Sequence, residues 1–161
     1  MITRLSPDAR KMVLISAAQE ARRRGDRRLG TDHLLLALLH DEDSSVARAV
    51  GVDLEAARAA SDSLDQAALV AVGVNVTHLG APPPSTFTRR RLLPLTSGAR
   101  AVLKATVEQT RRHSARQIQT RHFLLALLER EVPDPCAELL AALGVDRSQV
   151  RSRLEEPGES G

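Results

Sequence analysis

The stretch that decides the fold is RRLGTDHLLLALL, residues 27–39, because the chain contains a second copy of it, RQIQTRHFLLALL, at residues 116–128. In each copy an apolar residue, a spacer and a threonine precede a charged residue, a histidine and six consecutive apolar residues. Six apolar residues in a row leave a helix without a polar face, so its neighbours must cover it on every side. We therefore expect each copy to be the buried centre of its own small bundle, with Thr31 and Thr120 as the N-caps.

The composition favours an all-α fold. The chain has 161 residues, of which 42% are hydrophobic but only 1% aromatic, so the core must consist of Leu, Val and Ala, which pack helix against helix. The single cysteine, Cys136, excludes an internal disulfide and a cysteine-cluster metal site, and it fits a reducing compartment. No apolar run has the length of a membrane span, and residues 1–7 lack the apolar core of a signal peptide. We expect a cytoplasmic protein.

Residues 1–72 have the pattern of a four-helix unit. Ser6 is the expected N-cap of the first helix and Asp53 that of the fourth, and Gly51 is the expected left-handed end of the third. Gly25 is expected to end the first helix. The approximate helix ranges that the pattern predicts are 7–24, 31–40, 46–50 and 54–72.

Residues 95–156 repeat this pattern, with a first helix whose apolar face runs from 99 to 110, a central helix from Thr120, a short helix over about 134–143 and a last helix over about 147–154. The first helix region is one residue longer in the first unit. Repeats of this kind stack on each other to complete their cores. Residues 73–94, which include the run GAPPPS, are expected to form a linker, and residues 157–161 a disordered tail.

Three landmarks occur in the same order in both units: Leu-Ser/Thr-x-x-Ala-Arg, then Leu/Ile-x-Thr-x-His before Leu-Leu-Ala-Leu-Leu, then Gly-Val-Asp. Through them, residues 5–72 and 95–155 resemble the double N-terminal repeat domain of the Clp ATPases ClpA and ClpC. The resemblance implies two tandem four-helix repeats with pseudo-two-fold symmetry. The chain has no Gly-x-x-x-x-Gly-Lys-Ser/Thr phosphate loop, so we expect a stand-alone Clp N-domain-like protein without an ATPase module, an enzymatic activity or a cofactor.

The resemblance also implies a ligand site. In ClpC-type N-domains the phosphoarginine sites pair the acidic residue after the central threonine with the Ser or Thr that starts the first helix. By position, this implies a set of Ser6, Thr31 and Asp32 in repeat one. A carboxylate can pair with a guanidinium while helix-start amides and a hydroxyl receive the phosphate. Aspartate is one methylene shorter than the family's glutamate, and the alternative is that Asp32 only complements the positive end of its helix.

In repeat two, the corresponding set is Thr96, Thr120 and Arg121. Arg121 reverses the charge of Asp32, and a cation at this position repels a guanidinium. We therefore expect the second site to be lost or retuned toward plain anions.

The remaining reactive residue types favour structural roles. His33 and His122 occupy equivalent places in the two repeats, which indicates packing and hydrogen bonding rather than catalysis. His40 could share a face with His33, but no third ligand has a matching spacing, so no metal site is predicted. Cys136 lies among apolar neighbours and is expected in the core.

These patterns predict a non-catalytic binding module of the Clp protein-degradation system. We expect it to bind Clp unfoldase substrates or adaptors, or a Clp ATPase itself, through the Ser6 and Asp32 end of repeat one and the groove between the repeats. It would act as an adaptor or as a decoy. The resemblance also implies small cyclic-peptide ligands of Clp N-domains as partners, and no membrane partner is expected.

The arginines at 22–24 and 27–28 support an alternative, an arginine-rich regulatory protein that binds nucleic acid or an acidic partner. However, 23 basic residues face 20 acidic ones, the net charge is only +3, and we interpret most of the arginines as solvated surface. We do not expect nucleic acid as a partner. A third class, a small hydrolase, lacks a recognisable nucleophile, base and orienting group, so no catalytic residue is assigned.

Overall fold

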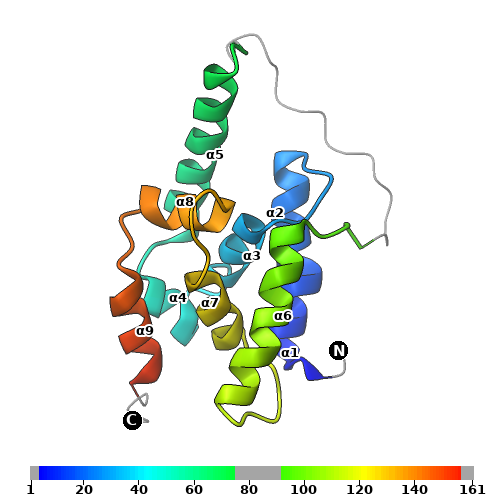
Figure 1. Cartoon of the computed structure of the whole chain (residues 1–161), viewed down its shortest axis with the longest axis vertical. Helices are drawn as coiled ribbons and strands as arrows, with labels where there is room; N and C mark the ends of the chain where they lie inside the picture. The colour runs from blue at the N-terminus through cyan, green and yellow to red at the C-terminus, as the bar shows by residue number, and fades with distance from the viewer. Residues whose placement is uncertain (1–3, 75–91, 157–161) are drawn as a thin grey trace.

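The computed structural model describes residues 4–74 and 92–156, and this part of the chain is helical without a strand, which confirms the all-α prediction (Figure 1). The elements of repeat one are α1 (Pro7–Lys11), the π-helix η2 (Met12–Ser16), α2 (Ala17–Arg24), α3 (Thr31–Leu38), α4 (Ser45–Val50) and α5 (Leu54–Ala71). Those of repeat two are α6 (Ser97–Arg112), α7 (Thr120–Leu128), α8 (Pro135–Ala142) and α9 (Arg147–Glu155). Most of the expected linker and the expected tail lie outside the described residues.

Most of the predicted helix ends are confirmed. The Ser6 side chain accepts a hydrogen bond from the Ala9 amide at 3.2 Å, and Asp53 accepts one from the Ala56 amide at 2.7 Å. Gly51 ends α4 at a φ of 74°, a left-handed conformation that a residue without a Cβ adopts readily. None of the helices in the described ranges is both long enough and apolar enough to cross a lipid bilayer.

The predicted N-caps of the central helices are wrong. The N-cap residues are Gly30 and Gln119, and each donates its backbone amide to the Nδ1 atom of a histidine three residues later, His33 at 2.8 Å and His122 at 3.0 Å. A histidine thus takes the part that a glutamate or glutamine has in a capping box. The threonines are the first residues of the helices, and the Thr31 hydroxyl bonds to Asp134 instead of capping its own helix.

The two apolar runs are buried as predicted, with every side chain of residues 34–39 and 123–128 at most 6% exposed. Each run is covered by the other helices of its own repeat, and in addition α3 packs directly against α7, so both belong to one continuous core. Helices α6 and α8 also pack on α3, and α4 packs on α9. The two repeats therefore stack to complete one core, as the repeat pattern predicts.

Short extended segments of the two repeats also pair with each other through backbone hydrogen bonds. The Leu29 amide donates to the Pro94 carbonyl at 2.9 Å, and the Thr96 amide donates to the Leu29 carbonyl at 3.0 Å. At the other end, the Ser6 amide donates to the Ile118 carbonyl at 2.9 Å. The residues before the first helix of each repeat thus pair with the residues before the central helix of the other repeat.

The additional residue of repeat one is accommodated by η2. The segment from Ser6 to Thr31 is one residue longer than that from Thr96 to Thr120. The matching helix of repeat two, α6, is α-helical throughout, whereas the first helix of repeat one widens into a π-turn over Met12–Ser16. A π-turn holds one more residue than an α-turn, so the helix keeps its direction despite the insertion.

A buried charge connects α2 to α5. Glu20 is fully buried and accepts hydrogen bonds from Arg58 of α5, from His40 at 2.7 Å and from Arg23 at 3.2 Å. Burial alone would raise the pKa of Glu20, but these partners outweigh it and lower the pKa to about 2. Glu20 therefore stays ionised in the interior.

The two capping histidines, His33 and His122, differ in the hydrogen bonding of their Nε2 atoms. His33 Nε2 lies 2.8 Å from Asp26, whereas the fully buried His122 Nε2 has no hydrogen-bond partner among the described residues. Burial, together with Arg121 and His113, lowers the pKa of His122 to about 4. The folded protein therefore holds His122 neutral at a pH where the unfolded chain protonates it.

We expect acid to destabilise the protein through His122. The stability due to its neutral form is complete above about pH 6.5 and is lost as the pH falls toward 4, by up to about 3 kcal/mol. His122→Gln, which keeps an acceptor for the Gln119 amide, should flatten the stability profile between pH 6.5 and 4.5 in urea titrations. Equal slopes for the variant and the wild type in this window would contradict the assignment.

Candidate functional site

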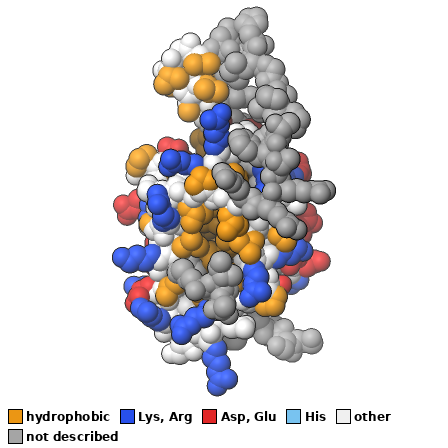
Figure 2. Space-filling model, turned by 90° about the vertical axis from the view of Figure 1, so that its right-hand side faces the viewer, with side chains coloured by type: hydrophobic (Ala, Val, Ile, Leu, Met, Phe, Trp, Pro, Cys, Tyr) orange, Lys and Arg blue, Asp and Glu red, His pale blue; other side chains and the backbone are white. Residues whose placement is uncertain are grey.

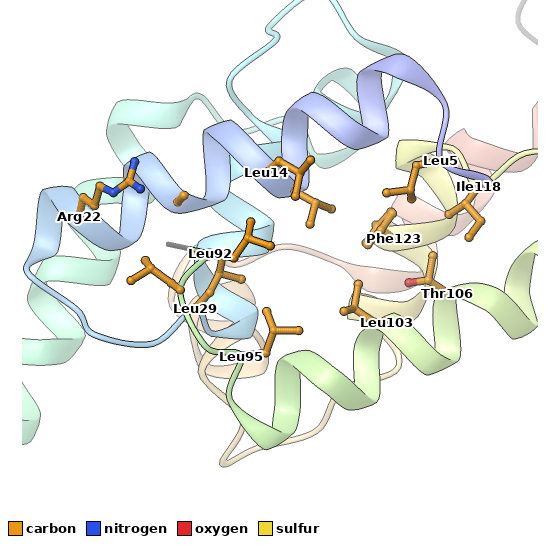
Figure 3. A pocket seen from close by; sticks show the side chains of 13 residues that line it. Leu5, Leu14, Arg22, Leu29, Leu92, Leu95, Leu103, Thr106, Ile118 and Phe123 are labelled. Carbon is orange, nitrogen blue, oxygen red and sulfur yellow. The ribbon is translucent and has the colours of Figure 1, made fainter. Parts of the chain in front are cut away.

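An apolar cavity of about 300 Å³ lies where the two repeats meet, and we call it the apolar cavity. The helical rod of α1, η2 and α2 flanks it on one side and α6 on the other (Figure 3). The space-filling view of this side of the molecule shows hydrophobic side chains around a central hollow (Figure 2). The apolar side chains that line the cavity include Leu5, Val13, Leu14, Leu29, Leu92, Leu93, Leu95, Leu103, Ile118 and Phe123.

The paired extended segments of the two repeats form the two ends of this cavity. Leu5 and Ile118 meet at one end, and Leu29 and Leu95 meet at the other, as Figure 3 shows. Each end thus contains one residue from each repeat, and the cavity exists only because the repeats are joined. The lining also includes an exposed guanidinium, that of Arg22, at the Leu29 end.

A second pocket, of about 700 Å³, lies where the beginnings of α3, α6 and α8 meet, and we call it the polar pocket. The Thr31 hydroxyl donates to Asp134 at 2.6 Å and accepts from the Cys136 amide at 3.2 Å, so a side chain of repeat one completes the cap of a helix in repeat two. A Cβ on Gly98 would lie only 3.0 Å from the Asp134 carboxylate and 3.4 Å from the Thr31 methyl group. The absence of a side chain at Gly98 thus allows the start of α6 to lie close to Asp134 and Thr31.

The residues that the sequence assigns to one ligand site in each repeat line different pockets in the structure. Asp32 and Thr31 line the polar pocket together with Thr96 of repeat two, whereas Ser6 is not among its lining residues. The structure thus places Thr31 and Asp32 beside Thr96 and not beside Ser6, and the ligand role of these residues stays a prediction. Ser6 and Asp32 lie apart because the pairing of the extended segments places the start of each first helix beside the central helix of the other repeat.

The three residues predicted for the site in repeat two, Thr96, Thr120 and Arg121, also lie apart. Thr120 lines a separate pocket of about 460 Å³ together with Asp8 and Lys11 of α1, away from Thr96. Arg121 is half-buried, and its Nε atom has no hydrogen-bond partner among the described residues. Thr96, Thr120 and Arg121 thus do not form one site.

The Asp32 carboxylate is already paired. The Arg24 guanidinium donates to it, and neither side chain is more than 12% exposed. The same guanidinium contacts Asp26 at 3.3 Å, Asp65 at 2.6 Å and the Ser61 hydroxyl at 3.0 Å. Sequence reasoning missed Arg24, because its partners come from three elements that the apolar pattern alone does not bring together.

The arginine cluster is not a single basic surface. Arg24 is held by three carboxylates, Arg23 pairs with Glu20 and Asp62, and Arg22 lines the apolar cavity. Carboxylates thus neutralise Arg23 and Arg24, whereas Arg27 and Arg28 line the polar pocket.

Other reactive residues have structural surroundings in the described part of the chain. His33 and His122 are buried and accept hydrogen bonds from backbone amides, as their equivalent positions predict. Cys136 is fully buried in the core, where burial raises the pKa of its thiol and keeps it protonated. Residues 4–74 and 92–156 hold no cluster of three or more His, Cys, Asp or Glu side chains suited to a metal ion.

Comparison with known proteins supports the resemblance noted in the sequence. The family model of the Clp repeat (R) N-terminal domain matches residues 4–85 and 94–160. Similar proteins include the chloroplastic chaperone protein ClpC2 of Oryza sativa subsp. japonica and the ATP-dependent Clp protease ATP-binding subunit ClpA homolog of Guillardia theta. Each is 28% identical over 157 residues, or 96% of this chain, but the chain spans only 15% and 17% of their respective lengths. The predicted cytoplasmic location stays a prediction.

The fold matches a solved structure. The crystal structure of the N-terminal domain of the caseinolytic protease associated chaperone ClpD from Arabidopsis thaliana superposes with a TM-score of 0.67 at 21% identity. The match covers 96% of this chain and 100% of that domain. The predicted resemblance to the double N-terminal repeat domain of Clp ATPases is confirmed.

We expect the Thr31 hydroxyl to stabilise the junction at the polar pocket. Thr31→Val removes the acceptor of the Cys136 amide and the donor to Asp134, and should cost about 1–2 kcal/mol of unfolding free energy. The matched control is Thr120→Val, because Thr120 makes no side-chain hydrogen bond among the described residues. Urea denaturation measures both, and equal losses would contradict the role given to Thr31.

Proposed function

Because this chain belongs to the Clp repeat (R) N-terminal domain family, whose members are non-catalytic substrate- and adaptor-binding modules of Clp ATPases, we propose that it captures apolar segments of client proteins in the apolar cavity. The observation that carries the proposal is a cavity of about 300 Å³ that both repeats line almost entirely with leucine, isoleucine, valine and phenylalanine. Folded clients hide such side chains, so the site would select unfolded or loosely folded chains.

Hydrophobic burial is the physical basis of this binding. Transfer of apolar surface from water is favourable and has no preferred direction, so one cavity accepts many sequences. Binding pockets for small ligands begin at about 300 Å³, which suffices for one or two large apolar side chains. Small cyclic peptides with apolar side chains would use the same cavity.

We further propose that the polar pocket recognises phosphoarginine, with a corrected set of residues. Asp32 would pair with the guanidinium, and Thr31 and Thr96, at the starts of α3 and α6, would lie near the phosphate. Ser6 is no longer part of this set. Arg27, Arg28 and Arg130 also line the pocket and would attract an anionic group.

The module would act on a Clp ATPase in one of two ways. An adaptor raises the rate at which a Clp ATPase processes a client, because it brings the client to the ATPase. A decoy lowers that rate, because it withholds the client. Adding the purified chain to a Clp-dependent degradation assay separates these two roles.

The cavity is tested with a charge placed in its wall. Leu103→Asp puts a carboxylate among apolar side chains, and we expect it to weaken binding of an unfolded model protein such as reduced, alkylated lactalbumin at least about tenfold, which corresponds to 1.4 kcal/mol. Val70→Asp is the control, since Val70 is 65% exposed on α5 and does not line the cavity. Fluorescence anisotropy gives both affinities. Equal affinities for the two variants would refute the proposal.

The phosphoarginine hypothesis has its own test. Calorimetry should show tighter binding of a phosphoarginine peptide than of the same peptide with plain arginine. Thr96→Val and Asp32→Ala should each reduce this difference, whereas Ser6→Ala should leave it unchanged once α1 is shown to be intact by circular dichroism. No difference between the two peptides for the wild type would end the phosphoarginine hypothesis.

A further inference from the structure

The Arg24 side chain occupies a place with the chemistry of a guanidinium site. Three carboxylates surround it, those of Asp26, Asp32 and Asp65, and the hydroxyl of Ser61 completes the set. The carboxylates lie on the loop before α3, on α3 itself and on α5, so the set is held by separate elements. Ser61 is only 3% exposed and Asp32 8%, so these two partners are held in place by the surrounding protein.

The same carboxylates face the polar pocket. Asp26 and Asp32 line that pocket, whereas Arg24, which contacts both of them, is not among its lining residues. A guanidinium that enters through the pocket would meet carboxylates that Arg24 already neutralises. A second guanidinium at the Asp32 carboxylate would lie beside that of Arg24, and like charges so close repel each other, so the two cations compete for this carboxylate.

We propose that Arg24 is a built-in competitor, whose guanidinium fills a carboxylate subsite that otherwise takes an arginine side chain of a client. Occupancy of the polar pocket by an arginine-bearing ligand then requires displacement of Arg24. This rests on the proposed function of the polar pocket, and it adds an autoinhibitory contact to it.

The position of Arg24 in its helix is compatible with displacement. Arg24 is the last residue of α2, and Gly25 follows it with a φ of 75°. The last turn of a helix lacks part of its hydrogen bonding and rearranges more easily than the helix centre. Two of the three carboxylates, on Asp26 and Asp65, are 37% and 51% exposed and therefore remain partly solvated without Arg24.

The subsite is tested by chemical rescue. Arg24→Ala leaves three carboxylates without their cation and should lower the melting temperature. Methylguanidinium chloride at 10–20 millimolar, about the range in which weak ions bind, should restore part of the loss, and methylammonium chloride at the same concentration should not. The wild type and Arg23→Ala, the matched control on the preceding residue, should respond equally to both salts. An equal response of Arg24→Ala to the two salts would overturn the subsite.

A second variant covers the case in which Arg24→Ala does not fold. The double variant Arg24→Ala/Asp65→Asn removes one of the three repelling carboxylates and keeps Asp32 and Asp26. It should show the same preference for methylguanidinium over methylammonium. Absence of this preference in a folded double variant overturns the proposal as well.

Competition is tested with the phosphoarginine peptide. Its affinity for Arg24→Ala should exceed that for the wild type about tenfold or more, while Arg23→Ala should match the wild type. An unchanged or weaker affinity of Arg24→Ala would overturn the competitor role. If the wild type and Arg24→Ala both fail to bind the peptide, the phosphoarginine function fails, whereas the rescue experiment alone decides whether the subsite exists.

Discussion

The whole structure depends on the burial of two helices that have no polar face. The side chains at 34–39 and 123–128 must leave water, and the remaining helices of one repeat cover only part of each central helix. Each central helix therefore packs on the other, and the repeats share one core. Backbone hydrogen bonds at Leu29 and Ile118 add to this arrangement, because each joins the segment before a central helix to the segment before the first helix of the other repeat. Both pockets lie at the resulting junction and contain residues from both repeats.

The junction also explains how equal repeats acquire unequal sites. The central helices begin in the same way, with a histidine that accepts from the residue before the helix. One residue before this histidine the two differ, since Asp32 pairs with Arg24, whereas the Nε atom of Arg121 has no hydrogen-bond partner among the described residues. His33 likewise has the acidic partner Asp26, which His122 lacks. The two central helices thus begin alike but have different charged neighbours.

Much of the fold could be predicted from the sequence, because it depends on local patterns. Caps at Ser6 and Asp53 and the left-handed end at Gly51 are local, and so is the apolar period of each helix. The presence of Thr96 rather than Ser6 in the same pocket as Asp32 could not be predicted, since it depends on how the repeats join. The same holds for the ion pair between Arg24 and Asp32. The insertion before Thr31 was visible as one additional residue, but only the structure places it in a π-turn.

The central claim is that one core shared by both repeats creates the binding surfaces. Native-state hydrogen exchange on the whole chain, measured in increasing denaturant, tests it most directly through the amides of α3 and α7. Our account predicts that the most protected amides of both helices open with the same free energy and the same denaturant dependence, equal to those of global unfolding. If the amides of one central helix opened at a clearly lower free energy while those of the other stayed protected, the repeats would be separate folding units and the account would be contradicted.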